Sequence, residues 1–390
     1  MRGDVFPSFS KPFALCLLGA GLMFGCKKPA APHPRFPQNT HAFARIDTHM
    51  HIDPRAIDRA LALMDRWGID GAVNLSGMHP GPPRHALEMQ MEAAGQSHGR
   101  IAVFATPSFV PTVRNFPQTY GAVMAEQLVE AKRLGAIGLK ITKGLGLGYP
   151  APDGQTLLAV DDPGLDPLFE KAGELGMPVA IHTGDPKAFW ERPDANNERI
   201  DELMAHPGWS LFEQPVASWQ ALLAQFERRV ARHPKTTFIG VHFGNAPEEP
   251  DRVAAMLDKY PNFFLDTAAR VPAIGRHSAE TIRAFFIKYQ DRILFGTDTG
   301  VGTTQDEMMY GSNGAEPPTA ADETRFFNQT YRYFETTDKK FEHPSAIQGR
   351  WTIDGLGLPD DVLRKLYFDN AARVLKWRPP ARKDVSKIPT

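Results

Sequence analysis

Short apolar runs alternate with amphipathic segments along most of the chain. Each apolar run has a composition typical of strands and ends in a turn, and the segment after it usually has apolar residues at helical spacing. The runs predict eight strands, at residues 43–51, 71–79, 101–109, 136–143, 178–185, 237–245, 262–270 and 292–300. The clearest predicted helices lie between them, at residues 57–68, 120–135, 166–176, 219–233 and 251–261.

This alternation predicts parallel strands joined by crossover helices. Eight units whose strands are apolar throughout favour one closed (β/α)8 TIM barrel over residues 42–378, with a final helix at 360–377 on its outside and a tail at 379–390. A doubly wound open sheet is the alternative, but it usually has fewer strands, and no glycine-rich dinucleotide-binding motif follows the first strand. Insertions follow strand 5, at residues 186–218, and strand 8, at residues 301–358, where barrel enzymes form substrate pockets.

The first 41 residues differ from the rest of the chain. Residues 13–24 form an apolar run after a thinly basic start, and Gly25 precedes Cys26, as in a bacterial lipoprotein signal. We therefore expect residues 1–26 to direct export, and Cys26 to carry a lipid that anchors the protein to a bacterial membrane facing the periplasm or the exterior. An ordinary signal peptide is the alternative. Residues 27–41 are rich in proline and are typical of a flexible tether.

Composition narrows the possible chemistry. The 390 residues carry a formal net charge of -1, which argues against nucleic acid as a partner because no basic excess remains to neutralise phosphates. Both cysteines, Cys16 and Cys26, precede the barrel, so the barrel can contain neither a disulfide nor a thiolate ligand. A metal site there would use His, Asp, Glu or Lys side chains, which suit zinc, manganese or iron.

Side chains of metal-binding types stand at the ends of several predicted strands. His49 and His51 end the first strand and point to the same side of it, because they lie two residues apart. Carboxyl ends of parallel strands meet on one rim of a barrel, so His182 and Asp298, from strands 5 and 8, would complete a site for one divalent ion. Such a site leaves room for water, which loses its proton near neutral pH when bound to zinc. His242, from strand 6, would act as a base or an electrostatic partner.

Taken singly, each of these residues also has a structural explanation. A His-x-His pair is often incidental, His182 could be a hydrogen-bonded core histidine, and Asp298 could cap a turn. Their coincidence on one rim favours the metal site, because buried polar groups need partners.

The motifs DTHMH, IHTGDP, GVHFGN, LFGTDTG and FDNAARVL, in this order, resemble those of the amidohydrolase superfamily. The resemblance spans residues 43–377 and is closest to the amidohydrolase-related branch, which contains aminocarboxymuconate-semialdehyde decarboxylase and the resorcylate-type decarboxylases. It implies a (β/α)8 barrel with one divalent metal ion, commonly zinc, with manganese as the other candidate, and often a homodimer. The two insertions depart from the decarboxylases, so substrate class does not transfer. Carried over by position, the metal ligands are His49, His51, His182 and Asp298, and the assisting histidine is His242.

Three further residues are candidates for substrate binding. Lys140 stands where some binuclear relatives carry a carboxylated bridging lysine, and it could equally offer a cation to an anionic substrate. Asp185 follows His182 by three residues and could orient its ring. Arg270, on strand 7, could pair with Asp266 or hold a substrate carboxylate.

The sequence leaves three functions open. The first is hydrolysis of an amide, lactone or similar carbonyl bond of a small molecule, in which metal-bound water attacks, Asp298 shuttles the proton and His242 stabilises the oxyanion. The second is non-oxidative decarboxylation of an aromatic or enoic acid at the same site. The third is a lipid-anchored binding protein that kept the barrel and lost turnover, although a complete ligand set weighs against it.

Overall fold

A computed structural model describes residues 43–81, 86–312 and 314–380. The predicted signal peptide with Cys26, the tether at residues 27–41 and the tail beyond Pro380 lie outside these ranges. Within them, no helix is long and apolar enough to cross a membrane.

All eight predicted strands are present, and each runs parallel to its neighbour in chain order. They are β1 (Ile46–Ile52), β2 (Gly71–His79), β3 (Ile101–Pro107), β4 (Gly138–Ile141), β5 (Val179–Ile181), β6 (Phe238–Gly240), β7 (Phe263–Asp266) and β8 (Ile293–Leu294).

The sheet closes on itself through the last strand. After a short break β8 continues as β9 (Thr299–Val301), which pairs in parallel with β1. Across the break, the amide of Thr48 donates to the Phe295 carbonyl at 2.9 Å, and the amide of Asp298 donates to the His49 carbonyl at 2.8 Å. The predicted (β/α)8 barrel is therefore confirmed, and the open sheet is excluded.

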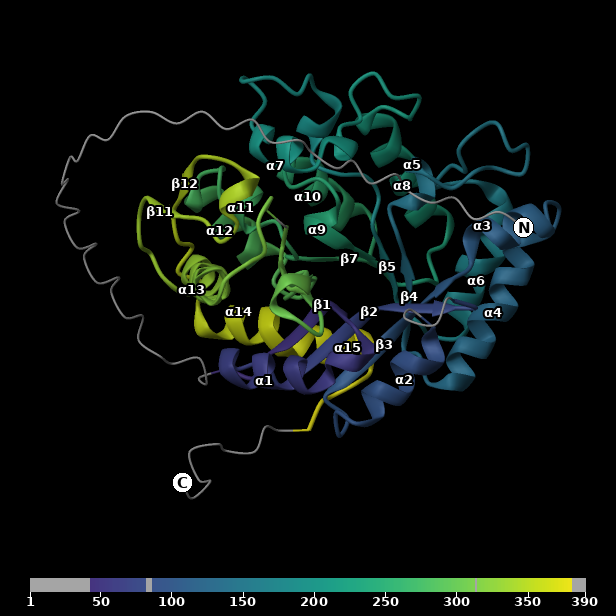
Figure 1. The fold of residues 1–390 in the computed structure, drawn as a ribbon, viewed down its shortest axis with the longest axis horizontal. Helices are drawn as coiled ribbons and strands as arrows, with labels where there is room; N and C mark the ends of the chain where they lie inside the picture. The colour runs from purple at the N-terminus through teal and green to yellow at the C-terminus, as the bar shows by residue number, and fades with distance from the viewer. Residues whose placement is uncertain (1–42, 82–85, 313, 381–390) are drawn as a thin grey trace, which may run out of the picture. The chain divides into compact units, whose positions relative to one another are not determined.

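Helices connect the strands and lie around the outside of the sheet (Figure 1). All five clearly predicted helices are present with ends close to those expected. The longer crossover helices are α1 (Ile57–Trp67), α2 (Leu87–Gly95), α3 (Phe109–Asn115), α4 (Tyr120–Leu134), α6 (Asp166–Glu174), α8 (Trp219–Arg232), α10 (Pro250–Lys259) and α12 (Ala279–Lys288).

Helix α1 shows how the sequence pattern sets such a helix. Ile57, Ala60, Met64 and Trp67 recur at helical spacing and are buried on one face. The helix ends at Gly68, whose φ of 71° is left-handed, a conformation that glycine adopts without the strain a Cβ would cause.

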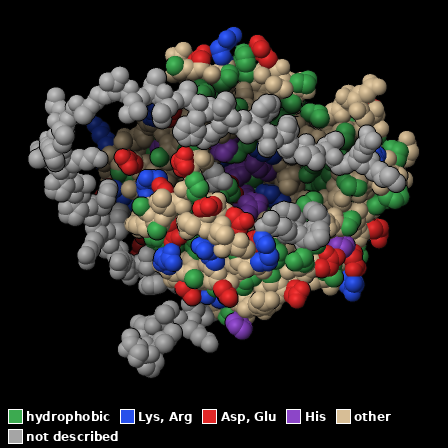
Figure 2. Space-filling model, viewed as in Figure 1, with side chains coloured by type: hydrophobic (Ala, Val, Ile, Leu, Met, Phe, Trp, Pro, Cys, Tyr) green, Lys and Arg blue, Asp and Glu red, His purple; other side chains and the backbone are tan. Residues whose placement is uncertain are grey.

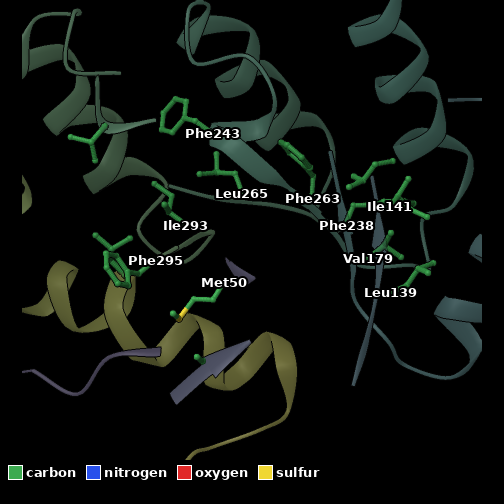
Figure 3. Close-up of a cluster of buried hydrophobic side chains, with 14 of the residues drawn as sticks. Met50, Leu139, Ile141, Val179, Phe238, Phe243, Phe263, Leu265, Ile293 and Phe295 are labelled. Carbon is green, nitrogen blue, oxygen red and sulfur yellow. The ribbon is translucent and has the colours of Figure 1, made fainter. Parts of the chain in front are cut away.

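Two apolar layers form the core. The larger lies between strands and helices and includes Leu139, Ile141 and Val179 (Figure 3). The smaller fills the barrel interior and includes Phe104 and Ala180. Because strand side chains alternate, successive residues of one strand enter different layers.

The C-terminal helix closes one end of the barrel. It runs as α14 (Asp360–Arg364), a π-helical turn (Lys365–Asp369) and α15 (Asn370–Leu375). Ala371, Ala372 and Leu375 belong to the interior cluster together with Ile46, the first residue of β1. The helix expected at 360–377 on the outside of the barrel instead covers the end where the strands begin, opposite the rim that carries the candidate site.

The two insertions bond to each other on the rim. The first contains 3-10 turns at Lys187–Trp190 and Pro207–Trp209 around α7 (Ile200–Ala205). The second contains β10 (Met309–Tyr310), α13 (Ala320–Glu335), β11 (Phe341–Glu342) and β12 (Thr352–Ile353). Arg350 pairs with Asp201 through contacts of 2.5 and 2.7 Å, and the Ser312 hydroxyl donates to Glu202 at 2.5 Å. The predicted insertions therefore form one joined structure.

Arg229 of α8 ties the crossover between β4 and α6 to the barrel wall. Its side chain is fully buried and donates to the carbonyls of Val160 at 3.0 Å and Asp162 at 2.6 Å, and to the Asp166 carboxylate. The guanidinium carbon lies 4.3 Å from the centre of the Phe169 ring. One cation thus satisfies several buried acceptors at once.

Arg229→Met should lower the free energy of unfolding by roughly 3 kcal/mol, because it leaves those buried acceptors without a donor. Arg228→Met is the matched control: Arg228 is the neighbouring residue, and its ion pair with Asp161 is exposed on the arginine side, so the change should stay below about 1 kcal/mol. Urea unfolding followed by circular dichroism measures both, and equal losses would contradict the role given to Arg229.

Candidate metal centre

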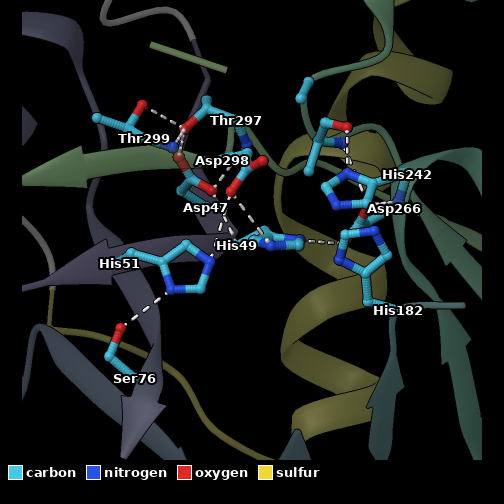
Figure 4. Close-up of polar contacts among 12 residues, drawn as sticks. Asp47, His49, His51, Ser76, His182, His242, Asp266, Thr297, Asp298 and Thr299 are labelled. Carbon is cyan, nitrogen blue, oxygen red and sulfur yellow. Dashed lines mark hydrogen bonds and ion pairs between the residues drawn. The ribbon is translucent and has the colours of Figure 1, made fainter. Parts of the chain in front are cut away.

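His49, His51 and Asp298 converge at the rim of the barrel (Figure 4). Oδ1 of Asp298 lies 3.4 Å from Nε2 of His49 and 3.5 Å from Nε2 of His51. One ligand atom from each residue falls within 4.8 Å of the others. The side chain of His49 is 1 % exposed and that of His51 is 34 % exposed, so the group extends from the buried core to the opening of the barrel.

Asp266, at the end of β7, fixes the orientation of His49. Its Oδ2 accepts a hydrogen bond from Nδ1 of His49 at 2.9 Å, which leaves Nε2 of that ring unprotonated and facing Asp298. Its Oδ1 accepts from the amides of His242 at 2.7 Å and Ala268 at 3.1 Å. Asp266 therefore does not pair with Arg270, which was one expectation for it.

Asp47 fixes the segment that presents Asp298. It is fully buried and accepts from the Thr297 hydroxyl at 2.6 Å, from the Thr297 amide at 3.1 Å and from the His49 amide at 3.0 Å. Gly296 lets this segment approach β1, because a Cβ there would lie 3.0 Å from that of His49.

His182 and His242 lie beside this group. Their ring centres are 4.4 Å apart, and the His242 ring is 4.9 Å from that of His49. His182 is not a member of the closely spaced group, and its place as a fourth ligand stays a prediction. Its Nε2 is buried and has no hydrogen-bond partner in the described part of the chain, as expected of an atom that faces a ligand.

Asp185 does not hydrogen-bond to His182. Its Oδ1 is 3.9 Å from Nε2 of that ring, and both carboxylate oxygens instead accept from Lys143, at 3.0 and 2.8 Å. Asn245 holds this stretch in place, since its side chain accepts from the Thr183 amide at 2.7 Å and donates to the Ile181 carbonyl at 3.2 Å.

Nδ1 of His242 donates to the Ala268 carbonyl at 2.9 Å. In the neutral ring Nε2 is then an acceptor, so it can take a proton but cannot donate to an oxyanion. Which of the two expected roles His242 has stays a prediction.

Left-handed backbone is concentrated around these strand ends. The non-glycine residues with positive φ there are His242 (56°), Phe243 (59°), Asn245 (63°), Ala269 (54°) and Asp298 (64°). Each such residue costs free energy that the surrounding packing must offset, and this kind of strain collects at functional sites.

Burial dominates the electrostatics of the site. It lowers the pKa of His49, of His182 and of His242 well below the usual value, with further lowering by nearby cations. These imidazoles are therefore neutral, the form that binds metal ions. Burial also raises the pKa of Asp298 and of Asp266 to about 6 each.

Lys140 and Arg270 are the buried cations of the site. Lys140 is 2 % exposed, and burial lowers its pKa to about 8. Arg270 is 7 % exposed and donates to the Ala269 carbonyl at 3.2 Å. Figure 2 shows histidine side chains gathered in a hollow, with basic side chains close by.

The donor set fits a divalent ion. Neutral imidazole nitrogens and a carboxylate suit zinc or manganese, and thiolates are absent from the barrel sequence. The unpartnered Nε2 of His182 beside the group supports the same conclusion.

The fold and this site place the molecule among barrel enzymes that act on small molecules at a divalent metal ion. The chain belongs to the amidohydrolase family, whose model matches residues 46–377. The resemblance read from the motifs is thus confirmed. Among curated proteins, none matches the sequence.

Several solved structures are similar to this chain. A 2,6-dihydroxybenzoate decarboxylase from Rhizobium is 18% identical, covering 86% of this chain and 99% of its own, with a TM-score of 0.48. A dihydroxybenzoic acid decarboxylase from Polaromonas sp. JS666, with bound manganese and the inhibitor 2-nitroresorcinol, is 14% identical over 86% and 97%, with a TM-score of 0.49. A 4-oxalomesaconate hydratase from Rhodopseudomonas palustris is 15% identical over 85% and 95%, with a TM-score of 0.45. Identities this low say nothing about the reaction of this chain.

Sequence reasoning missed Asp47 and gave Asp266 a different partner. For Asp47 the available signal was its position two residues before His49, although the register of β1 is irregular between Asp47 and Met50. No sequence signal pointed from Asp266 to His49, which lies 217 positions away.

Asp266→Asn should weaken zinc or manganese binding by roughly 10–100-fold, because the amide cannot replace a carboxylate that accepts from one ring and two backbone amides. Competition with a chromophoric chelator measures the affinity. Asp258→Asn, which removes an exposed carboxylate paired with Lys288, is the control and should leave the affinity unchanged. Unchanged affinity in the Asp266 variant would refute this role.

Proposed function

We propose that this protein is a metal-dependent hydrolase that cleaves an amide, lactone or similar carbonyl bond of a small molecule. The main support is the convergence of His49, His51 and Asp298, with the buried unpartnered nitrogen of His182 beside them. When bound there, a zinc or manganese ion would polarise a carbonyl oxygen and make water a better nucleophile.

The chain's own residues would divide the remaining work. Asp298 would move the proton of the attacking water, because its carboxylate faces both imidazoles of β1 and stays 14 % exposed on its side chain. His242 would accept a proton at Nε2, since Nδ1 is committed to the Ala268 carbonyl. Asp266 would keep His49 in the tautomer that binds the ion.

Non-oxidative decarboxylation of an aromatic or enoic acid is the second candidate. The buried cations Lys140 and Arg270 favour it, because they could hold the carboxylate that leaves as CO₂. The two reactions differ in product rather than in the residues that they require.

Export and a lipid anchor at Cys26 are proposed from the sequence of residues 1–41 alone. They concern where the enzyme works and not its reaction.

Removal of the metal ion with a chelator should abolish turnover, and zinc or manganese should restore it. A panel of amides, lactones and aromatic acids, with acid release and CO₂ release measured separately, identifies the reaction. We expect acid release. CO₂ release without hydrolysis would replace the hydrolase by the decarboxylase, and full activity after chelation would exclude both.

Asp298→Asn should lower kcat by roughly 10²–10⁴-fold, because the amide cannot accept the proton, while the melting temperature changes little. Asp306→Asn, in an exposed turn of the insertion that follows strand 8, is the control and should retain full activity. Steady-state kinetics with metal content measured in parallel tests this. Unchanged turnover in the Asp298 variant would refute its role as proton shuttle.

A further inference from the structure

Lys140 lies inside the barrel with its ammonium group unpaired. In the register of β4 with β5 it stands opposite Ala180, which belongs to the interior cluster, whereas its neighbours Leu139 and Ile141 belong to the outer layer. Nζ is buried and has no hydrogen-bond partner in the described part of the chain.

The ionisable groups that interact with Lys140 belong to the candidate metal centre. It interacts electrostatically with the carboxylates of Asp298 and Asp266, and with the rings of His182 and His242. A buried ammonium without a hydrogen-bond acceptor is costly, so its presence calls for an acceptor from outside the chain.

The neighbours of Lys140 indicate the kind of partner that it lacks. Asp266 already accepts from His49 and from two backbone amides, and Asp298 faces the two imidazoles of β1. A carboxylate that binds a divalent ion is less available to the ammonium, so Lys140 suits an anionic group of a ligand.

The other charged groups near the rim have neighbours of opposite charge. Lys143 pairs with Asp185 at 2.8 Å, and Arg199 pairs with Glu202 at 3.2 Å. Glu248 interacts electrostatically with Arg270, so Lys140 is the cation best placed to hold a negative group of a ligand.

We propose that Lys140 is a substrate-binding residue that holds a carboxylate of the substrate beside the metal centre. This deepens the proposed function and rests on it: the substrate is a small carboxylic acid that also carries the bond to be cleaved. An ammonium offers three N–H donors and no acceptor, which suits a carboxylate and not an amide nitrogen. Carboxylation of Lys140 would instead add a negative charge near the carboxylates of Asp266 and Asp298 and would require a second cation.

The test is Lys140→Met in the metal-loaded protein, with isothermal titration calorimetry of benzoate and glutarate against benzamide and glutaramide. The wild type should bind a carboxylate, and the variant should bind it roughly 10–100-fold more weakly, because a charge-assisted hydrogen bond is lost. Affinity for the amides should fall much less, because their neutral carbonyl oxygen accepts a weaker hydrogen bond than a carboxylate does. Lys132→Met, which removes the same charge from the exposed face of α4, is the control and should leave both affinities unchanged.

Lys140→Met should keep its metal content and melt no lower than the wild type, because an unpaired buried charge is replaced by an apolar side chain of similar length. Equal carboxylate affinity in variant and wild type would overturn the proposal. So would loss of the metal ion in the variant, which would make Lys140 a support of the metal, or failure of the wild type to bind either carboxylate. Turnover that survives chelation would end the proposed hydrolase and leave this binding result intact, so the two failures are distinguishable.

Discussion

The buried carboxylate of Asp266 is the interaction on which the site depends. It stands at the end of β7 and bonds to a ring from β1, to the amide of His242 after β6, and to the amide of Ala268 in its own loop. A fully buried carboxylate is stable only when its oxygens have donors, so the three segments must approach one another to provide them. The same contacts set the tautomer of His49 and the position of His242. The tautomer of His49 and the position of His242 therefore depend on the closure of the barrel.

Backbone strain follows from the same arrangement. The chain after β6 passes through successive left-handed residues, among them His242 and Phe243, and Asp298 is left-handed as well. None of these conformations is preferred by an isolated chain. They persist because the amide of His242 is held by Asp266 and the amide of Asp298 by the carbonyl of His49. Strand pairing thus stabilises conformations that point the functional side chains toward one another.

The insertions add no residue to the closely spaced group of His49, His51 and Asp298. They leave the ends of strands 5 and 8 and join through contacts such as Arg350 with Asp201 and Ser312 with Glu202. Residues that hold the metal would then belong to the barrel, and residues that shape the opening would belong to the insertions. This division explains how a family can keep one site while its substrates change. In this chain Lys140, below the rim, would supply the part of specificity that depends on charge.

The sequence by itself determined the architecture and most of the candidate site. Apolar periodicity placed all eight strands, because the alternation of buried faces is a local property of the chain. The two-residue spacing of His49 and His51 put both on one side of β1, and the rim followed from parallel strands. Only the tertiary structure decided which side chains pair: Asp185 with Lys143 rather than with His182, and Asp266 with His49 rather than with Arg270. Those contacts join different strand ends, and their distances depend on the closure of the barrel and the left-handed turns after its strands, which no local pattern encodes.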